Sequence, residues 1–156
     1  MKNMMLPAKS CSILLCALLL LAAGCKKDPK VEPETFVSNV SRPSWTAIAV
    51  PDMTSSMTAV VKVDLKAQYP EIAADWQLKD EDRLAAFISD NCVGVASPKE
   101  GLFFLYIAGT EGAVTLRYYS AHYKNLFEAK DVFPFRNDDH LGTVAEPITP
   151  AFVVVK

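Results

Sequence analysis

Alternation of apolar and polar residues with a period of two is the feature that most limits what this chain can fold into. Between Met57 and Leu65, and again between Val114 and Tyr119, every second residue is apolar. The residues that share one side are Met57, Ala59, Val61, Val63 and Leu65 in the first stretch, and Val114, Leu116 and Tyr118 in the second. Successive side chains of a strand point to opposite faces, so this pattern predicts half-buried β-strands.

Other stretches extend the β pattern over most of the chain. Leu102–Ile107 is apolar throughout, which predicts a central strand covered on both faces. Tyr69–Arg83 contains Pro70 and an acidic cluster and is expected to be a long loop. Turn signals separate the strands at 89–91, 97–101, 110–112 and 137–139. Short strands at about ten-residue spacing predict an all-β chain with a single antiparallel β-sandwich, immunoglobulin-like or carbohydrate-module-like.

The N-terminus has the features of an export signal. Lys2 and Lys9 precede an apolar run from Ile13 to Ala23. A membrane-spanning helix needs roughly 20 apolar residues, so this run is too short to remain as a span. A basic start and an apolar core of about 7–15 residues that ends in small residues are typical of a secretory signal peptide.

The end of this run resembles the bacterial lipoprotein signal, the lipobox, in Leu21-Ala22-Ala23-Gly24-Cys25. The resemblance implies cleavage before Cys25, acylation of Cys25 with chains such as palmitate, and attachment to the membrane without a transmembrane helix. One acyl chain gives only marginal binding, so two or three chains on one residue suit a stable anchor. The alternative is an ordinary signal peptide in which Cys25 is incidental.

The residues after Cys25 predict a tether. Residues 26–35 are charged, contain two prolines and hold little to bury, which predicts disordered or extended chain. The expected organisation is a signal peptide at 1–24, the lipidated cysteine and tether at 25–43, and the β-sandwich domain at 44–156. Lys26-Lys27-Asp28 resembles the start of Bacteroidetes-type surface lipoproteins. This implies an outer-membrane protein at the cell surface, with the periplasmic face as the other location.

Charge and cysteine content exclude some functions. Removal of residues 1–24 takes away Lys2, Lys9 and no acid, so the formal net charge changes from −2 to −4. This mildly acidic balance gives no basic surplus for binding nucleic acid. Cys92 would then have no partner within the mature chain, and we expect it to be buried as a small hydrophobic residue rather than to act as a nucleophile.

The block from Arg83 to Ile107 resembles a β-sandwich module that recurs in Bacteroidetes-type secreted and surface proteins. The matching residues are Leu84–Phe87, Cys92, Gly94–Ala96 and Leu102–Leu105, and the likeness continues through Leu116–Ala121 to Leu141-Gly142. The resemblance implies the fold and the compartment and brings no activity with it. Physically, the block predicts two adjacent strands in which Gly94 and nearby alanines let the opposing sheet approach.

No catalytic motif stands out. The hydrolase elbow, the zinc-protease His-Glu-x-x-His and the phosphate-binding glycine loops are all absent from the sequence. His122 and His140 are expected to be solvated loop residues. Acidic turns at 80–82 and 138–139 are expected to be solvated too, and whether they bind calcium stays open, since calcium needs six to eight oxygen ligands. We therefore predict a non-enzyme with no catalytic residue, no metal and no cofactor.

Aromatic residues are the better lead to a ligand. The candidate ligand-binding residues are Trp76, Tyr119, Tyr123 and Arg117. Sugar rings stack on exposed aromatic faces, and binding residues concentrate on loops held by a rigid scaffold. The alternative is that Trp76 caps the core and Tyr119 packs across strands.

Three functional hypotheses follow. The first is a non-enzymatic, lipid-anchored surface module that docks a protein or a glycan. The second is an accessory subunit that pairs through a strand edge, with Ala151–Val155 as the donor, although we expect that run to complete its own sheet. The third is a small hydrolase that uses His122 or His140.

Overall fold

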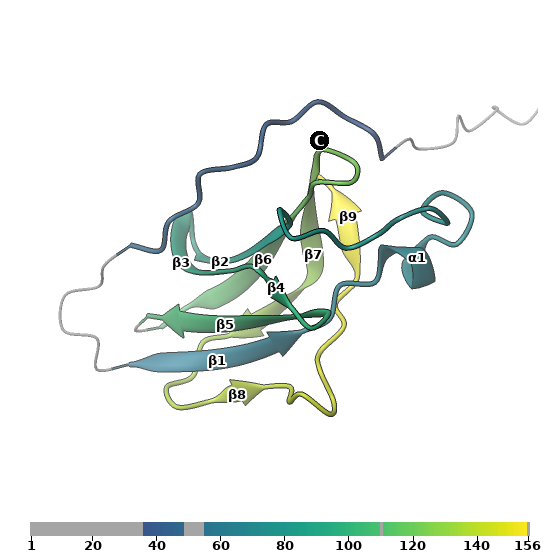
Figure 1. Ribbon diagram of the computed structural model, residues 1–156. Helices are drawn as coiled ribbons and strands as arrows, with labels where there is room; N and C mark the ends of the chain where they lie inside the picture. Colours follow the sequence, from purple (N-terminus) through teal and green to yellow (C-terminus); the bar gives the residue numbers. More distant parts are fainter. Residues whose placement is uncertain (1–35, 49–54, 110, 156) are drawn as a thin grey trace, which may run out of the picture. The chain divides into compact units, whose positions relative to one another are not determined.

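The computed structural model describes residues 36–48, 55–109 and 111–155 (Figure 1). Within them lie nine strands and one short helix. In chain order these are β1 (Ser56–Val61), α1 (Leu65–Gln68), β2 (Arg83–Ile88), β3 (Asn91–Ala96), β4 (Pro98–Lys99), β5 (Leu102–Ala108), β6 (Ala113–Ser120), β7 (Asn125–Pro134), β8 (His140–Leu141) and β9 (Phe152–Val154). No helix of this described part has the length and apolar character that a membrane span requires.

The strands form two sheets. The order is β4-β5-β1-β8 in the four-stranded sheet and β3-β2-β6-β7-β9 in the five-stranded sheet. The five-stranded sheet is antiparallel, but the four-stranded sheet is mixed because β8 runs parallel to β1, with Thr58 opposite His140. The expectation of purely antiparallel sheets is wrong here. β8 arrives from β7 in the other sheet through the turn at 137–139, so no hairpin obliges it to run antiparallel to β1.

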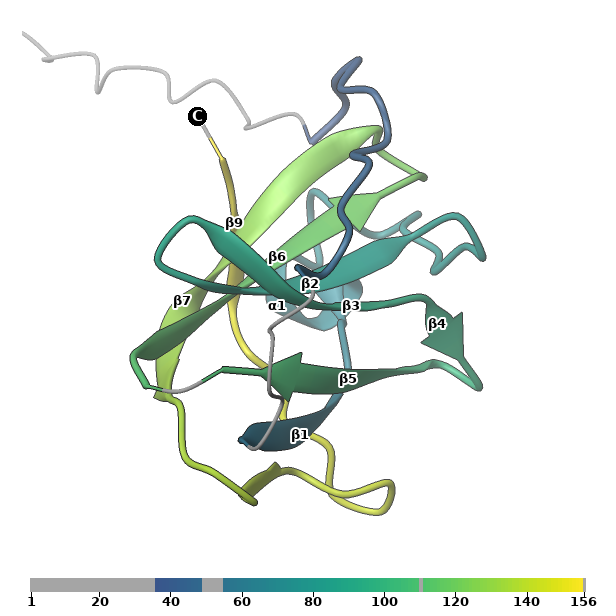
Figure 2. The same ribbon diagram turned by 90° about the vertical axis from the view of Figure 1, so that its left-hand side faces the viewer.

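Figure 2 shows the two sheets, with β1 and β5 below β2 and β6. Their inner faces contribute to one hydrophobic core. The inward residues of β1 and β6 are all buried, as the period-two pattern predicted: Met57, Ala59, Val61, Val114, Leu116 and Tyr118. Phe103 of β5 meets Tyr118 of β6 with ring centroids 6.0 Å apart. Two sheets around one core are consistent with a β-sandwich.

β5 differs from its prediction. Its inward residues Phe103 and Leu105 are buried, but Phe104 is 42% exposed and Tyr106 is 52% exposed. The strand therefore has one covered face, not two. An apolar residue run could not reveal this, because it looks the same whether one face or both are covered.

Gly94 marks the point where β3 approaches the other sheet. β2 and β3 are adjacent and antiparallel, as predicted. A Cβ atom on Gly94 would lie 2.5 Å from the backbone oxygen of Tyr106 in β5. The absence of a side chain at Gly94 therefore allows the two sheets to come together here, which confirms its predicted role.

The segment 36–48 lies against the domain. Phe36 is buried in the core, and the amides of Ser38 and Val40 donate to the backbone oxygens of Tyr123 and Lys124 at 2.9 Å each. The described part of the predicted tether, residues 36–43, is thus docked on the domain, because Phe36 supplies a large apolar side chain for the core. Residues 25–35 lie outside the described residues.

The segment between β1 and β2 is mostly loop, as predicted for Tyr69–Arg83, although β2 already begins at Arg83. α1 comes just before it, and the Asp64 side chain caps its start by accepting from the Ala67 amide at 2.9 Å. Ala73 and Trp76 of the loop reach the core. This brings the loop alongside the turn between β6 and β7.

Candidate functional site

The predicted aromatic binding residues are buried. Trp76 is 9% exposed, Tyr119 5% and Tyr123 4%. A sugar ring can stack only on an aromatic face that it can reach, so these three rings are not available as stacking surfaces in this structure. The position of Trp76 in the core cluster matches the alternative interpretation, in which it caps the core.

Tyr119 points away from the core, yet it is buried because the segment 36–48 lies over it. The Tyr119 hydroxyl donates to the backbone oxygen of Val40 at 3.4 Å. Further along the same outer face, Trp45 packs edge-on against Phe87 of β2 with centroids 5.9 Å apart. The segment ends where the Ile48 amide donates to the Cys92 oxygen at 2.9 Å. We call residues 36–48 the covering segment.

Arg117 has partners within the chain. Its Nε donates to Glu128 Oε2 at 2.9 Å, and its guanidinium lies 4.5 Å from the centre of the Phe87 ring. Both interactions are partly exposed, so their contribution to stability is modest. They nevertheless hold the Arg117 side chain on the outer face of the five-stranded sheet.

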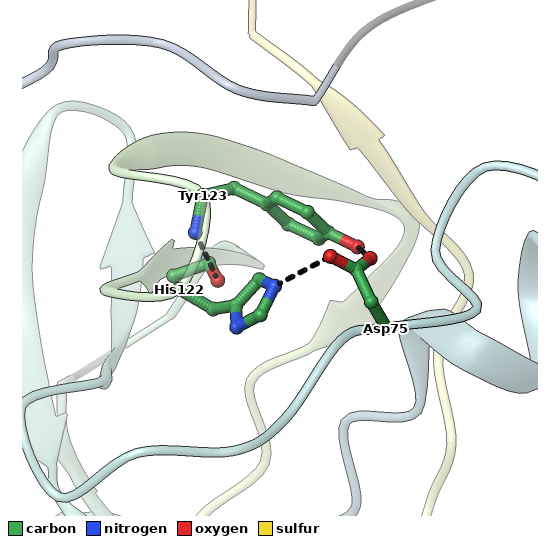
Figure 3. A network of polar contacts seen from close by, with 4 residues as sticks. Asp75, His122 and Tyr123 are labelled. Carbon is green, nitrogen blue, oxygen red and sulfur yellow. Dashed lines mark hydrogen bonds and ion pairs between the residues drawn. The ribbon is translucent and has the colours of Figure 1, made fainter.

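A polar network joins the long loop to the turn between β6 and β7 (Figure 3). The Tyr123 hydroxyl donates to Asp75 Oδ1 at 2.9 Å, and His122 Nε2 lies 3.3 Å from Asp75 Oδ2. The rings of His122 and Tyr123 meet edge to face, 4.6 Å apart. His122 is thus held by two neighbours, and its prediction as a simply solvated loop residue is wrong.

The network shifts the acidity of its members. The Tyr123 hydroxyl, and then the His122 imidazole, hold the pKa of Asp75 below its ordinary value of 3.8. Burial, followed by the hydrogen bond to Asp75, raises the pKa of Tyr123 to about 12. Ionised Asp75 and protonated Tyr123 therefore persist over a wide pH range.

Two histidines each have part of a nucleophile–base arrangement. Asp75 can orient His122, but no hydroxyl or thiol of the described residues is hydrogen-bonded to that ring. His140 Nδ1 lies 2.6 Å from Thr58 Oγ1, but no carboxylate of the described residues orients the imidazole. A working set needs nucleophile, base and orienting group together.

The acidic turns differ from each other. Asp138 and Asp139 are satisfied locally, by the Asn137 amide group at 3.0 Å and the His140 amide at 2.9 Å. No group of three or more His, Cys, Asp and Glu side chains in the described residues is arranged to hold a metal ion.

Asp82 is fully buried, so the prediction of a solvated turn is wrong for this residue. Its carboxylate accepts from the Tyr118 hydroxyl at 2.6 Å and from the Ala121 amide at 2.7 Å. Burial raises the pKa of Asp82, while these hydrogen bonds act in the opposite direction. One sequence signal pointed here: Asp82 is in phase with the inward-facing Leu84 and Ala86 of β2.

Cys92 is the cysteine that lies among the described residues. Cys25, the predicted lipidation site, lies outside the described residues. Cys92 is free and half-buried, with its Sγ 3.7 Å from the Gly94 oxygen, and burial raises the pKa of its thiol. A raised pKa disfavours the reactive thiolate.

The C-terminal run completes its own sheet, as expected. β9 pairs antiparallel with β7. Gln68 covers part of the outer edge of β9, because its side chain donates to the Pro150 oxygen at 2.8 Å and accepts from the Phe152 amide at 2.9 Å. An occupied strand with a partly covered edge is a poor donor to another chain.

The outer face of the four-stranded sheet carries the exposed aromatic residues. Phe104 and Tyr106 of β5 lie opposite Val60 and Thr58 of β1, and Thr58 also lies opposite His140 of β8. Residues paired in this way point to the same face. We call Thr58, Val60, Phe104, Tyr106 and His140 the open face. Sequence reasoning missed it, although alternation within Leu102–Ile107 would have placed Phe104 and Tyr106 together.

Comparison with known proteins gives no further guide to the site. No protein-family model matches the sequence, and neither a curated protein nor a solved structure matches it.

Proposed function

We propose that this chain is a lipid-anchored, non-enzymatic β-sandwich module that docks a glycan at the outer membrane, facing the cell surface. The sequence Leu21-Ala22-Ala23-Gly24-Cys25 carries the anchor part of this proposal. Acyl chains on Cys25 hold the module at the membrane, and the charged residues that follow separate it from the lipid.

The finer fold in this proposal is an immunoglobulin-like or carbohydrate-module-like sandwich. Two sheets that share one core support it, as do the short strands and the turns between them. Such a scaffold holds its outer faces rigid, which suits recognition.

The open face supports the glycan-binding part of the proposal. Phe104 and Tyr106 are two residues apart on β5, so their backbone positions are about 7 Å apart. Two aromatic side chains at this spacing suit neighbouring sugar rings, and the Thr58 hydroxyl and the His140 imidazole beside them provide hydrogen bonds for sugar hydroxyls. Exposed apolar patches with a polar border are typical of interaction sites.

Removal of the lipid site tests the anchor. The Cys25→Ala protein should leave the membrane fraction and appear in the soluble envelope or culture fraction, and palmitate labelling should be lost. A Cys92→Ala protein is the matched control and should keep both label and location. Cys25→Ala protein that stays in the membrane would contradict the anchor.

Removal of the aromatic rings tests the open face. Glycan-array binding by the full chain should fall at least tenfold in Phe104→Ala and Tyr106→Ala proteins. Val132→Ala, which removes a 56% exposed apolar side chain from β7, should bind as the parent does. If no glycan binds and a protein co-purifies stoichiometrically instead, the glycan assignment is wrong and the accessory-subunit hypothesis replaces it.

A further inference from the structure

The covering segment forms a cavity with the start of β2. The cavity has a volume of about 360 Å³ and is lined by Arg42, Pro43, Ser44, Trp45, Thr46 and Arg83. Its lining includes two arginines and no acidic residue. Two positively charged side chains without a balancing acid in the lining favour a negatively charged ligand.

Arg83 is positioned by the backbone. Its Nη1 donates to the oxygen of Asp80 at 2.9 Å and to the oxygen of Asp82 at 2.6 Å. Its Nε and Nη2 make no hydrogen bond with the described residues. These two nitrogens form the edge of a guanidinium that binds a carboxylate, sulfate or phosphate with two parallel hydrogen bonds.

Arg42 is exposed and makes no hydrogen bond or ion pair with the described residues. It therefore adds a second set of donors to the cavity. Since an arginine guanidinium stays protonated at all ordinary pH values, both charges are present whenever the protein is folded.

The size and the remaining lining indicate more than a bare ion. A water molecule occupies about 30 Å³. The volume of the cavity is therefore several times larger than a small anion of similar size would fill. Ser44 and Thr46 bring hydroxyl groups, and Pro43 and Trp45 bring apolar surface. This mixture suits a polar ring that bears the anionic group.

We propose that this cavity binds an acidic saccharide, with the carboxylate of a uronic acid or the sulfate ester of a sugar held between Arg42 and Arg83. The site is separate from the open face, and the proposal does not depend on the anchor or on glycan binding there. Because the contact is ionic, binding weakens as salt concentration rises.

Calorimetric titration of the full chain in detergent tests the proposal, with glucuronic acid and glucose 6-sulfate as probes. Glucose and inorganic sulfate are the comparison ligands, because one lacks the charge and the other lacks the ring. At least one acidic sugar should bind at least tenfold more tightly than both comparison ligands.

Arg42→Gln is the main variant, because Arg42 has no structural partner to lose among the described residues. It should weaken binding about tenfold or more, the loss expected for a hydrogen bond to a charged group. Arg136→Gln removes the same charge from an exposed position outside the cavity and should bind as the parent does. Arg83→Lys keeps the charge but loses the paired donors, so it should also weaken binding while its thermal unfolding stays close to that of the parent.

Three results would overturn the proposal. They are no binding of either acidic sugar, equal losses in Arg42→Gln and Arg136→Gln, and inorganic sulfate that binds as tightly as the sugars, which would indicate a simple anion site. Loss of the open face in Phe104→Ala protein should leave this binding unchanged, so the two sites can fail independently.

Discussion

The outer faces of the two sheets differ in how far their aromatic residues are exposed. On the five-stranded sheet, Phe87 and Tyr119 point outward and are nevertheless buried, because the covering segment lies over them. On the four-stranded sheet, Phe104 and Tyr106 point outward and remain about half exposed. An outward aromatic residue is thus structural on one sheet and available for binding on the other.

The difference arises from one anchored side chain. Phe36 packs in the core against Tyr69, Tyr123 and Phe127, with centroid separations of 4.9–5.7 Å. Once it is fixed there, the residues that follow run along the five-stranded sheet (Figure 2). The described chain supplies no equivalent anchor that would lay a segment over Phe104 and Tyr106.

The largest effect on stability should come from Phe36, which holds the covering segment. Phe36→Ala should lower the free energy of unfolding by about 4 kcal/mol, because it removes a buried aromatic ring and leaves a cavity. Phe104→Ala, the same change on the open face, should cost less than about 0.5 kcal/mol. Urea denaturation of the two proteins measures both values, and similar losses would show that the faces do not differ as described.

The second-largest effect on stability should come from the contact between the sheets at Gly94. Gly94→Ala should cost about 3 kcal/mol, because its new Cβ would meet the Tyr106 oxygen at 2.5 Å and β3 and β5 would have to separate. Gly101→Ala is the control: it has open space around it but a φ of +82°, so it should cost only about 1 kcal/mol. Thermal unfolding distinguishes them, and the reverse order would refute the close approach.

A smaller effect should depend on pH. Tyr123 and His122 lower the pKa of Asp75 in the folded state, so ionised Asp75 adds stability above its ordinary pKa of 3.8, and this stability is lost as the pH falls through the lowered value. Asp75→Asn should be less stable than the parent at pH 7, and the gap should close in acid.

The Asp75 prediction concerns the covered sheet as well, because the backbone oxygen of Tyr123 accepts a hydrogen bond from the Ser38 amide of the covering segment. Asp90→Asn changes an exposed turn residue and should follow the parent at every pH. Denaturation at a series of pH values gives the comparison, and a gap that widens in acid would have the wrong sign.

The smallest effect concerns the thiol beside the end of the covering segment. Cys92 should react slowly with a maleimide at pH 7, because it is half-buried and its pKa is raised. Unfolded mature protein should react quickly and show one thiol per chain. Labelling at the same rate in folded and unfolded protein would contradict the burial, and four thiols would mean that the signal segment is still present and Cys25 unmodified.

Local patterns predicted much of the fold. Alternation placed the inward residues of β1 and β6 correctly, turn residues marked the ends of the strands, and the C-terminal run was expected to pair within its own sheet. These predictions succeeded because strand geometry and turn chemistry depend on neighbours in the sequence. Predictions that needed distant neighbours failed, as for the second face of β5.

The candidate sites divide in the same way. Trp76, Tyr119 and Tyr123 were chosen for their residue type, but their exposure depends on segments far away in the chain. Asp75 and His122 are 47 residues apart, and no spacing rule brings them together. Arg42 and Arg83 line one cavity only because the covering segment passes the start of β2.

The sequence by itself determined the strands that alternation marks, β1 and β6, which of their sides faces the core, and the lipobox-like signal from which the anchor is proposed. Only the tertiary structure decided which outward side chains stay exposed. The physical reason is that side-chain direction follows from the backbone of the residue itself, whereas burial requires another part of the chain to lie on top. In this protein, that part is the covering segment held by Phe36.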